Sequence, residues 1–155
     1  MLAIGIYLKL LRADSSASNY QFQNFFQGEN RTYNGDVYMF GAFGFSGGTL
    51  DLDGGNIEAS LVFALNEISA SVFSQAAREM WLAQIRTVWL EPDGFVESAT
   101  HSEELYAITG VSHDSSRLNV RLGSPIDAID QNVPRRVLTT SLVGELPSTG
   151  QINLN

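Results

Sequence analysis

In the stretch EASLVFALNEISASVFSQAAREMWLAQI, residues 58–85, the hydrophobic period changes once, at Asn66. Before Asn66, apolar residues alternate as in a strand with one buried face, which holds Ala59, Leu61, Phe63 and Leu65. After it, apolar residues recur every three or four positions, as in an amphipathic helix. The stretch therefore predicts a strand followed by one packed α-helix around residues 69–83, with Ser69 or Ser71 as its N-cap.

Strand patterns lie on both sides of this unit. Residues 3–11 and 85–92 are rich in apolar residues, and Tyr33-Asn34-Gly35-Asp36 is typical of a tight hairpin turn. Residues 104–123 predict two strands joined by a turn at residues 112–116, the second of which alternates cleanly. The sequence therefore predicts a mainly β fold, an antiparallel β-sandwich or barrel with one packed helix.

The length of 155 residues predicts a single domain, 1–155, large enough to bury a core. Residues of about 1–30 are expected to form an N-terminal strand and a loop or arm. Residues of about 141–155 are polar and are expected to form a C-terminal docking tail. The chain has no cysteine, which excludes disulfides and thiolate-bound metals.

Charge and hydropathy narrow the possible partners. The net charge of -8 argues against a nucleic-acid-binding face, which needs a basic patch. The apolar N-terminus is interrupted by Lys9 and lacks a basic leading region, so it is interpreted as a strand and not a signal peptide. No apolar run reaches the ~18 residues that a membrane span needs. We expect no membrane partner and assembly in a cytoplasm.

The residue types of several catalytic and metal sites occur, but in unsuitable arrangements. Ser112-His113-Asp114 are consecutive, whereas a hydrolase triad converges from separate parts of a chain, so a turn is expected. His101 and His113 lack metal-ligand spacing, and Glu103 and Glu104 alternate faces of a strand.

Three further motifs also have ordinary explanations. Asp51 and Asp53 begin like a calcium loop, but the later ligand positions do not fit. Asn30-Arg31-Thr32 matches a glycosylation sequon by coincidence, and the glycine-rich residues 41–48 lack the lysine of a phosphate loop. Trp81 and Trp89 are expected to be core or interface anchors. We expect no enzyme activity, no cofactor and no metal.

An aromatic, glycine-rich segment suggests a non-enzymatic binding module as an alternative. Tyr38, Phe40, Phe43 and Phe45 lie in an extended run with interspersed glycines. A β-sandwich that binds carbohydrate or a protein partner through this segment would need exposed rings. The alternation with glycine indicates that many of the rings are buried.

The triplet Pro134-Arg135-Arg136 is unusual in an acidic chain. Arginine makes bidentate contacts with carboxylates, so two interpretations stay open: a clamp within the chain, or a clamp between subunits. Normal assembly and infectivity of particles that carry Arg135→Ala with Arg136→Ala would exclude the second.

Read in order, four segments resemble one family, the N-terminal domain of minor tail protein L of lambda-like phages and related short tail-tip or baseplate proteins. They are YMFGAFGFSGG (38–48), EASLVFALNEISASVF (58–73), IRTVWLEPDG (85–94) and ELYAITGVSHDSSRLNVRLGSPIDAIDQNVPRRVL (104–138), of which LGSPIDAIDQNVPRR (122–136) is the most specific piece. The resemblance covers roughly residues 31–140. The cysteine-containing, iron–sulfur-like region of that family has no counterpart here.

The resemblance implies a structural virion protein of a phage tail, without enzymatic activity. Its subunits would form a trimeric or hexameric ring that connects the tail tube to the central hub or spike, with DNA passing through only as cargo. Its partners would be the tube, distal tail or hub, and spike proteins. Candidate subunit-interface residues are Pro134, Arg135, Arg136, Tyr38, Phe40 and Trp89.

Overall fold

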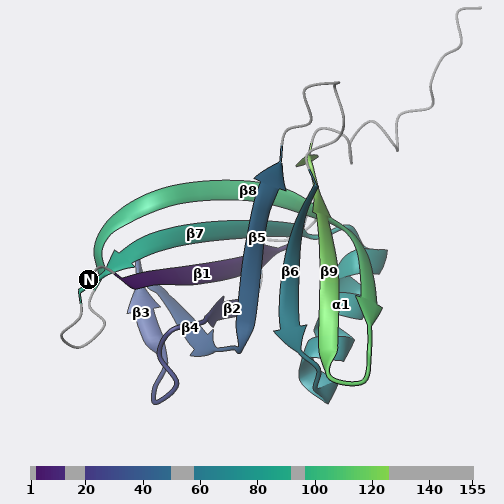
Figure 1. Cartoon of the computed structure of the whole chain (residues 1–155), viewed down its shortest axis with the longest axis horizontal. Helices are drawn as coiled ribbons and strands as arrows, with labels where there is room; N and C mark the ends of the chain where they lie inside the picture. The colour runs from purple at the N-terminus through teal and green to yellow at the C-terminus, as the bar shows by residue number, and fades with distance from the viewer. Residues whose placement is uncertain (1–2, 13–19, 50–57, 92–96, 126–155) are drawn as a thin grey trace, which may run out of the picture.

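The computed structural model describes residues 3–12, 20–49, 58–91 and 97–125 (Figure 1). Within them, nine strands and one helix follow in the order β1 (Ala3–Leu11), β2 (Gln21–Gln23), β3 (Arg31–Tyr33), β4 (Asp36–Phe40), β5 (Phe43–Thr49), β6 (Glu58–Ala64), α1 (Glu67–Arg78), β7 (Leu82–Leu90), β8 (Glu97–His113) and β9 (Arg117–Gly123).

All nine strands belong to one sheet, in the order β3-β4-β2-β1-β7-β8-β9-β6-β5. Neighbouring strands are antiparallel except β2 and β4, which pair in parallel. The prediction of a mainly antiparallel β fold with one helix is confirmed. In the described part of the chain no ladder joins the edge strands β3 and β5, so the sheet is open and the barrel form of that prediction is not found.

Strand β8 bends the sheet into two facing halves. Its first part pairs with β7 and its last part with β9, and β-bulges at His101 and Thr109 interrupt the two ladders. A bulge inserts a residue and increases the local bend. In Figure 1, β8 arches over the molecule, so that β5, β6 and β9 run across the direction of β1 and β7.

The helix begins two residues earlier than predicted, because Asn66 is its N-cap. The Asn66 Oδ1 atom accepts a hydrogen bond from the Ser69 backbone N–H at 2.7 Å, and the Ser69 hydroxyl oxygen accepts one from the Asn66 N–H at 3.0 Å. This reciprocal capping box satisfies two N–H groups at the start of the helix. The predicted caps are therefore corrected: Ser69 is the third helical residue and Ser71 lies inside the helix.

The helix also ends earlier than residue 83. Met80 adopts a left-handed conformation with φ 49°, and the Trp81 N–H donates to the Ala76 carbonyl at 2.9 Å. This is the hydrogen bond of a Schellman motif, which reverses the chain after the helix. Strand β7 therefore starts at Leu82, inside the stretch that the sequence assigned to the helix.

Replacing Asn66 with alanine is expected to lower the free energy of unfolding by about 1 kcal/mol, because it removes the side-chain acceptor of the capping box. The urea midpoint, followed by circular dichroism, measures the change. Asn30→Ala is the matched control, since Asn30 is exposed immediately before β3. Equal midpoints for the two variants would contradict a stabilising role for the cap.

The main core lies between the two halves of the sheet and α1. It contains Leu8, Leu10, Phe22, Phe43, Ala59, Leu61, Phe63, Val72, Phe73, Ala76, Trp81, Ala83, Ile85, Tyr106, Ile108, Leu118, Val120 and Leu122. The predicted buried faces of β6 and β9 are therefore confirmed, and Trp81 is a core residue. The Trp81 indole N–H also donates to the Glu79 carboxylate at 2.7 Å, so this core ring keeps its polar atom satisfied.

A smaller cluster of Tyr7, Tyr38, Val88 and Leu90 lies on the opposite face of β1 and β7. The β3–β4 hairpin covers it, because the ring of Tyr33 stacks on that of Tyr7 at 4.6 Å and the Tyr38 ring lies equally close. The hairpin turn has φ 50° at Asn34 and φ 86° at Gly35, which confirms the predicted Asn-Gly turn.

Candidate functional site

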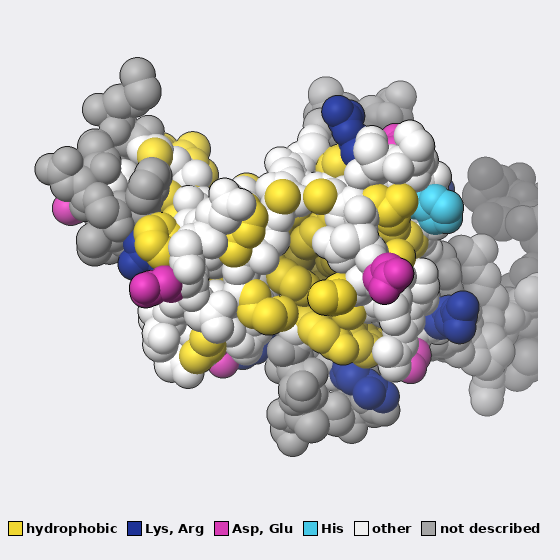
Figure 2. All heavy atoms as spheres, turned by 90° about the horizontal axis from the view of Figure 1, so that it is seen from below, with side chains coloured by type: hydrophobic (Ala, Val, Ile, Leu, Met, Phe, Trp, Pro, Cys, Tyr) yellow, Lys and Arg dark blue, Asp and Glu magenta, His cyan; other side chains and the backbone are white. Residues whose placement is uncertain are grey.

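An apolar groove at the base of the molecule is the candidate functional surface (Figure 2). It consists of a cleft of ≈ 310 Å³ next to the start of α1 and an adjoining cleft of ≈ 640 Å³ that extends to Ser116 and Arg117. We define the base groove as the residues shared by both clefts together with two residues on the rim of the first. These are Phe40, Ala42, Phe63, Ala64, Met39 and Ile68.

Backbone hydrogen bonds hold the floor of the base groove in place. The Gly41 N–H donates to the Gln23 carbonyl at 2.9 Å, and the Ala64 N–H donates to the Ala42 carbonyl at 3.0 Å. A Cβ atom at Gly41 would lie 3.3 Å from the Phe22 ring, so glycine suits this close approach. The link between β4 and β5 is thereby fixed against both β2 and β6.

The rim of the base groove exposes large apolar side chains. Ile68 is 67% exposed and Met39 is 41% exposed. Ile68 faces outward because the Asn66 cap sets the start of the helix, which buries Ser69 and Val72 instead. Arg117 is the one charged residue among the described residues that line the two clefts. A contiguous exposed apolar surface of this kind is typical of contact with another macromolecule.

The aromatic segment does not form an exposed platform. Tyr38 and Phe43 are buried, and the Phe45 ring packs 5.9 Å from that of Tyr106. Phe40 is half-buried and lines the base groove. The expectation that many of these rings are buried is confirmed, and little ring surface remains for stacking on a carbohydrate.

The six predicted interface residues are not brought together by the described part of the chain. Tyr38 is 2% exposed and packs inside the smaller cluster, so it presents little surface to a neighbour. Phe40 lies in the base groove, and Trp89 lies half-buried in β7 with its ring edge-on to His101 at 4.8 Å. The Pro134-Arg135-Arg136 triplet lies outside the described residues, so its interface role stays a prediction.

Ser112, His113 and Asp114, the residues of the apparent triad, belong to a strand end and a turn. The Asp114 carboxylate accepts hydrogen bonds from the backbone N–H groups of Ser116 at 2.8 Å and Arg117 at 2.7 Å, which lower the pKa of Asp114. The predicted turn is thus found, but it begins at Asp114, because Ser112 and His113 still pair with β9. These contacts are those of an Asx turn and not the hydrogen bonds of a catalytic triad.

The other predicted site motifs are also separated. His101 and His113 lie well apart along β8, and the described residues contain no group of three or more histidine and carboxylate side chains that could hold a metal ion. Glu103 binds Arg86, whereas the Glu104 carboxylate accepts a hydrogen bond from the Tyr106 hydroxyl. Asp51 and Asp53 lie outside the described residues.

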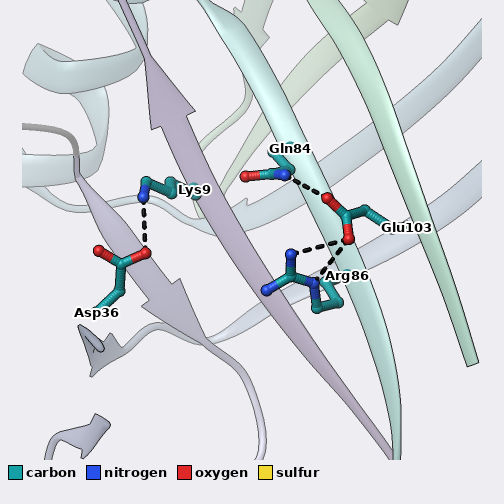
Figure 3. A network of polar contacts seen from close by, with 5 residues as sticks. All are labelled: Lys9, Asp36, Gln84, Arg86 and Glu103. Atoms are coloured by element: carbon teal, nitrogen blue, oxygen red, sulfur yellow. Dashed lines mark hydrogen bonds and ion pairs between the residues drawn. The ribbon is translucent and has the colours of Figure 1, made fainter. Parts of the chain in front are cut away.

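A polar network ties the sheet together on the face opposite the main core (Figure 3). Lys9 on β1 donates to Asp36 at the hairpin turn at 2.7 Å. Arg86 on β7 donates from Nη2 to Glu103 on β8 at 2.8 Å, and Gln84 donates to the same carboxylate. Each carboxylate meets a cation from another strand, so the network fixes the hairpin and the β7–β8 ladder.

This network makes stability pH-dependent at acid pH. The hydrogen bond from Lys9 lowers the pKa of Asp36 from 3.8, and the hydrogen bond from Arg86 lowers the pKa of Glu103 from 4.5. A carboxylate with a lower pKa in the folded state stabilises the fold above its unfolded pKa, and this contribution is lost as the pH falls through the folded pKa.

The free energy of unfolding is therefore expected to decrease when the pH falls below 4.5, by under about 1 kcal/mol for each of these partly exposed pairs. Urea midpoints measured across this range test the expectation. The double variant Asp36→Asn with Glu103→Gln should show a shallower decrease. An unchanged pH profile in that variant would assign the acid sensitivity to other carboxylates.

No protein-family model matches this chain, and no curated protein matches its sequence. Within the described residues, no helix is long and apolar enough to cross a membrane. The base groove is thus the feature of the described structure from which a function is best argued.

Proposed function

We propose that this chain is a structural virion protein of a phage tail tip or baseplate, forming a ring that connects the tail tube to the central hub or spike. The observation that carries the proposal is the base groove, an exposed apolar surface on a mainly β fold. In a tail, this surface would pack against the adjacent tube, distal tail, hub or spike protein and so would be buried from water.

The segments that carry the family resemblance also build this surface. Residues 38–48 supply Met39, Phe40 and Ala42, and residues 58–73 supply Phe63, Ala64 and Ile68. The capping box at Asn66 and the fixed link at Gly41 hold the two segments against each other. The resemblance and the geometry therefore favour the same part of the chain as the contact surface.

The charge of the chain suits a ring around a DNA channel. A net charge of -8 repels phosphate, so DNA would pass through the ring as cargo without binding. As the family resemblance implies, the ring would contain three or six copies of this chain, and the proposal includes no cofactor or membrane partner.

Disruption of the gene in the phage that encodes this chain tests the proposal. We expect particles without complete tails and a loss of infectivity, both restored when the intact chain is supplied in trans. Complete, infectious particles would contradict the proposal. Complete tails with a loss of host binding alone would instead favour the alternative, a β-sandwich binding module for a carbohydrate or protein partner.

A further inference from the structure

Strand β5 leaves one edge of the sheet open. In the part of the chain that the structure describes, it pairs with β6 alone, and the Phe43 carbonyl accepts a hydrogen bond from the side-chain amide of Asn24 at 3.2 Å on its other side. Because backbone groups alternate in direction along a regular strand, those of Phe45 point to the same outer edge, up to the register shift that follows Ser46. Among the described residues, no backbone hydrogen bond is formed there.

This edge lacks the charged residues and proline that protect many sheet edges from pairing with another chain, and the irregularity that it has is a register shift between Ser46 and Thr49. Protected edges are short, or they carry charged residues or proline. The opposite edge of the sheet, β3, has three residues and includes Arg31. Strand β5 has the uncharged sequence FGFSGGT, and Gly44, Ser46 and Gly47 are exposed. The open edge of β5 is therefore suited to accept a further strand.

We propose that the open edge of β5 accepts residues 137–143 of a neighbouring copy of this chain as an added strand. The segment has the sequence VLTTSLV, which is uncharged and rich in β-branched residues, as strands prefer. Its leucines and valines would add large side chains beside a strand that contains three glycines. The inference rests on the proposed function, because a ring needs a contact between two different surfaces of the same chain.

The charges of the two segments are compatible with another copy as the source of the strand. Two copies that each carry a net charge of -8 repel one another over most of their surfaces. Neither residues 43–49 nor residues 137–143 contain a charged residue, so this contact avoids that repulsion. The same pairing places Arg135 and Arg136 directly next to the contact, where they can meet carboxylates of the neighbouring copy.

The chain is long enough for this contact. Strand β9 ends at Gly123, and β9 pairs with β6, which pairs with β5. Residues 124–136, which precede the segment, can span about 40 Å when extended. This length exceeds the distance of about 15 Å across three strand spacings, so the segment can extend beyond its own sheet to an adjacent subunit.

Cysteine cross-linking tests the pairing, since the full chain has no cysteine of its own. One preparation carries Ser46→Cys, and others carry Leu138→Cys, Thr140→Cys or Leu142→Cys. Each of the latter is mixed with the first at high protein concentration under a mild oxidant. We expect a disulfide-linked dimer from at least one mixture, seen on a non-reducing gel. Ser74→Cys, which is exposed on α1 and does not line either cleft, takes the place of the tail variant in the matched control mixture.

Three outcomes would overturn the inference. The first is the absence of a cross-link from every mixture. The second is a dimer from Ser46→Cys alone, which would show pairing of β5 with itself. The third is a double variant, such as Ser46→Cys with Thr140→Cys, that cross-links only within one chain, which would place the segment on its own sheet.

The same material separates this inference from the proposed function. Cross-linked dimers from a chain that is absent from phage particles would contradict the tail function and leave the strand contact standing. A chain present in a few copies in each particle, but without any cross-link in those particles, would contradict the strand contact alone.

Discussion

Replacing Phe63 with alanine is expected to lower the free energy of unfolding by about 3–5 kcal/mol. The Phe63 side chain is 4% exposed, and its ring lies 4.6 Å from that of Phe73, 4.8 Å from that of Phe43 and 5.7 Å from that of Phe22. Truncation would leave a cavity where α1, β5 and β2 meet. The loss is a large part of the ~5–15 kcal/mol that stabilises a typical domain.

Urea unfolding followed by tryptophan fluorescence measures this effect. Val37→Ala is the control, because Val37 is 50% exposed and its truncation should change stability by within about 0.5 kcal/mol. If Phe63→Ala loses no more than this control, the aromatic rings do not pack as a core and the base groove lacks a rigid floor.

Replacing Ile68 with aspartate is expected to prevent incorporation of the chain into particles while leaving its fold intact. Ile68 projects from the first turn of α1 into the rim of the base groove. A carboxylate there would be buried without a partner if a neighbouring protein covers the groove, which is strongly unfavourable. In the free chain the same carboxylate lies near the helix N-terminus, where a negative charge is slightly stabilising.

Quantitative detection of the chain in purified particles measures this loss, and urea unfolding of the isolated variant checks the fold. Ser74→Asp is the matched control, because Ser74 is exposed on the same helix and does not line the base groove. Normal incorporation of the Ile68→Asp chain would show that the base groove does not contact neighbouring tail proteins.

Much of the fold follows from local patterns that tertiary packing does not override. Alternation predicted β6 and β9 because each strand buries one face, and the Asn-Gly pair predicted the hairpin because it adopts positive φ angles readily. Strand β1 matches its predicted range of residues 3–11, and it lies inside the sheet between β2 and β7.

The errors in the prediction have specific physical causes. The helix ends at Arg78, and the left-handed residue after its C-cap is Met80, where the usual residue is glycine. The apolar spacing of Met80 and Ala83 therefore falsely extended the predicted helix. The turn at Asp114 starts late because Ser112 and His113 remain in the β8–β9 ladder. Whether the sheet closes into a barrel depends on how far β8 bends at its bulges. Local sequence patterns do not predict this bend.

The base groove was not predicted, although the sequence analysis singled out two of its residues, Phe40 and Phe63. Met39 and Phe40 meet Phe63 and Ile68 because the sheet bends, which brings β4 and β6 together although they lie near opposite edges of the sheet. The sequence pattern did not predict that the side chains of Ile68 and Met39 are exposed. The one available signal was Ile68 itself, an apolar residue directly after the helix cap and outside the buried stripe of the helix.

The central claim is that this chain forms a ring at the end of a phage tail. Quantitative mass spectrometry of purified particles from the source that encodes the chain tests it most directly, by counting copies relative to the major tube protein. We expect a few copies in each particle, three or six, as in one trimeric or hexameric ring. Absence of the chain from the particles would contradict it.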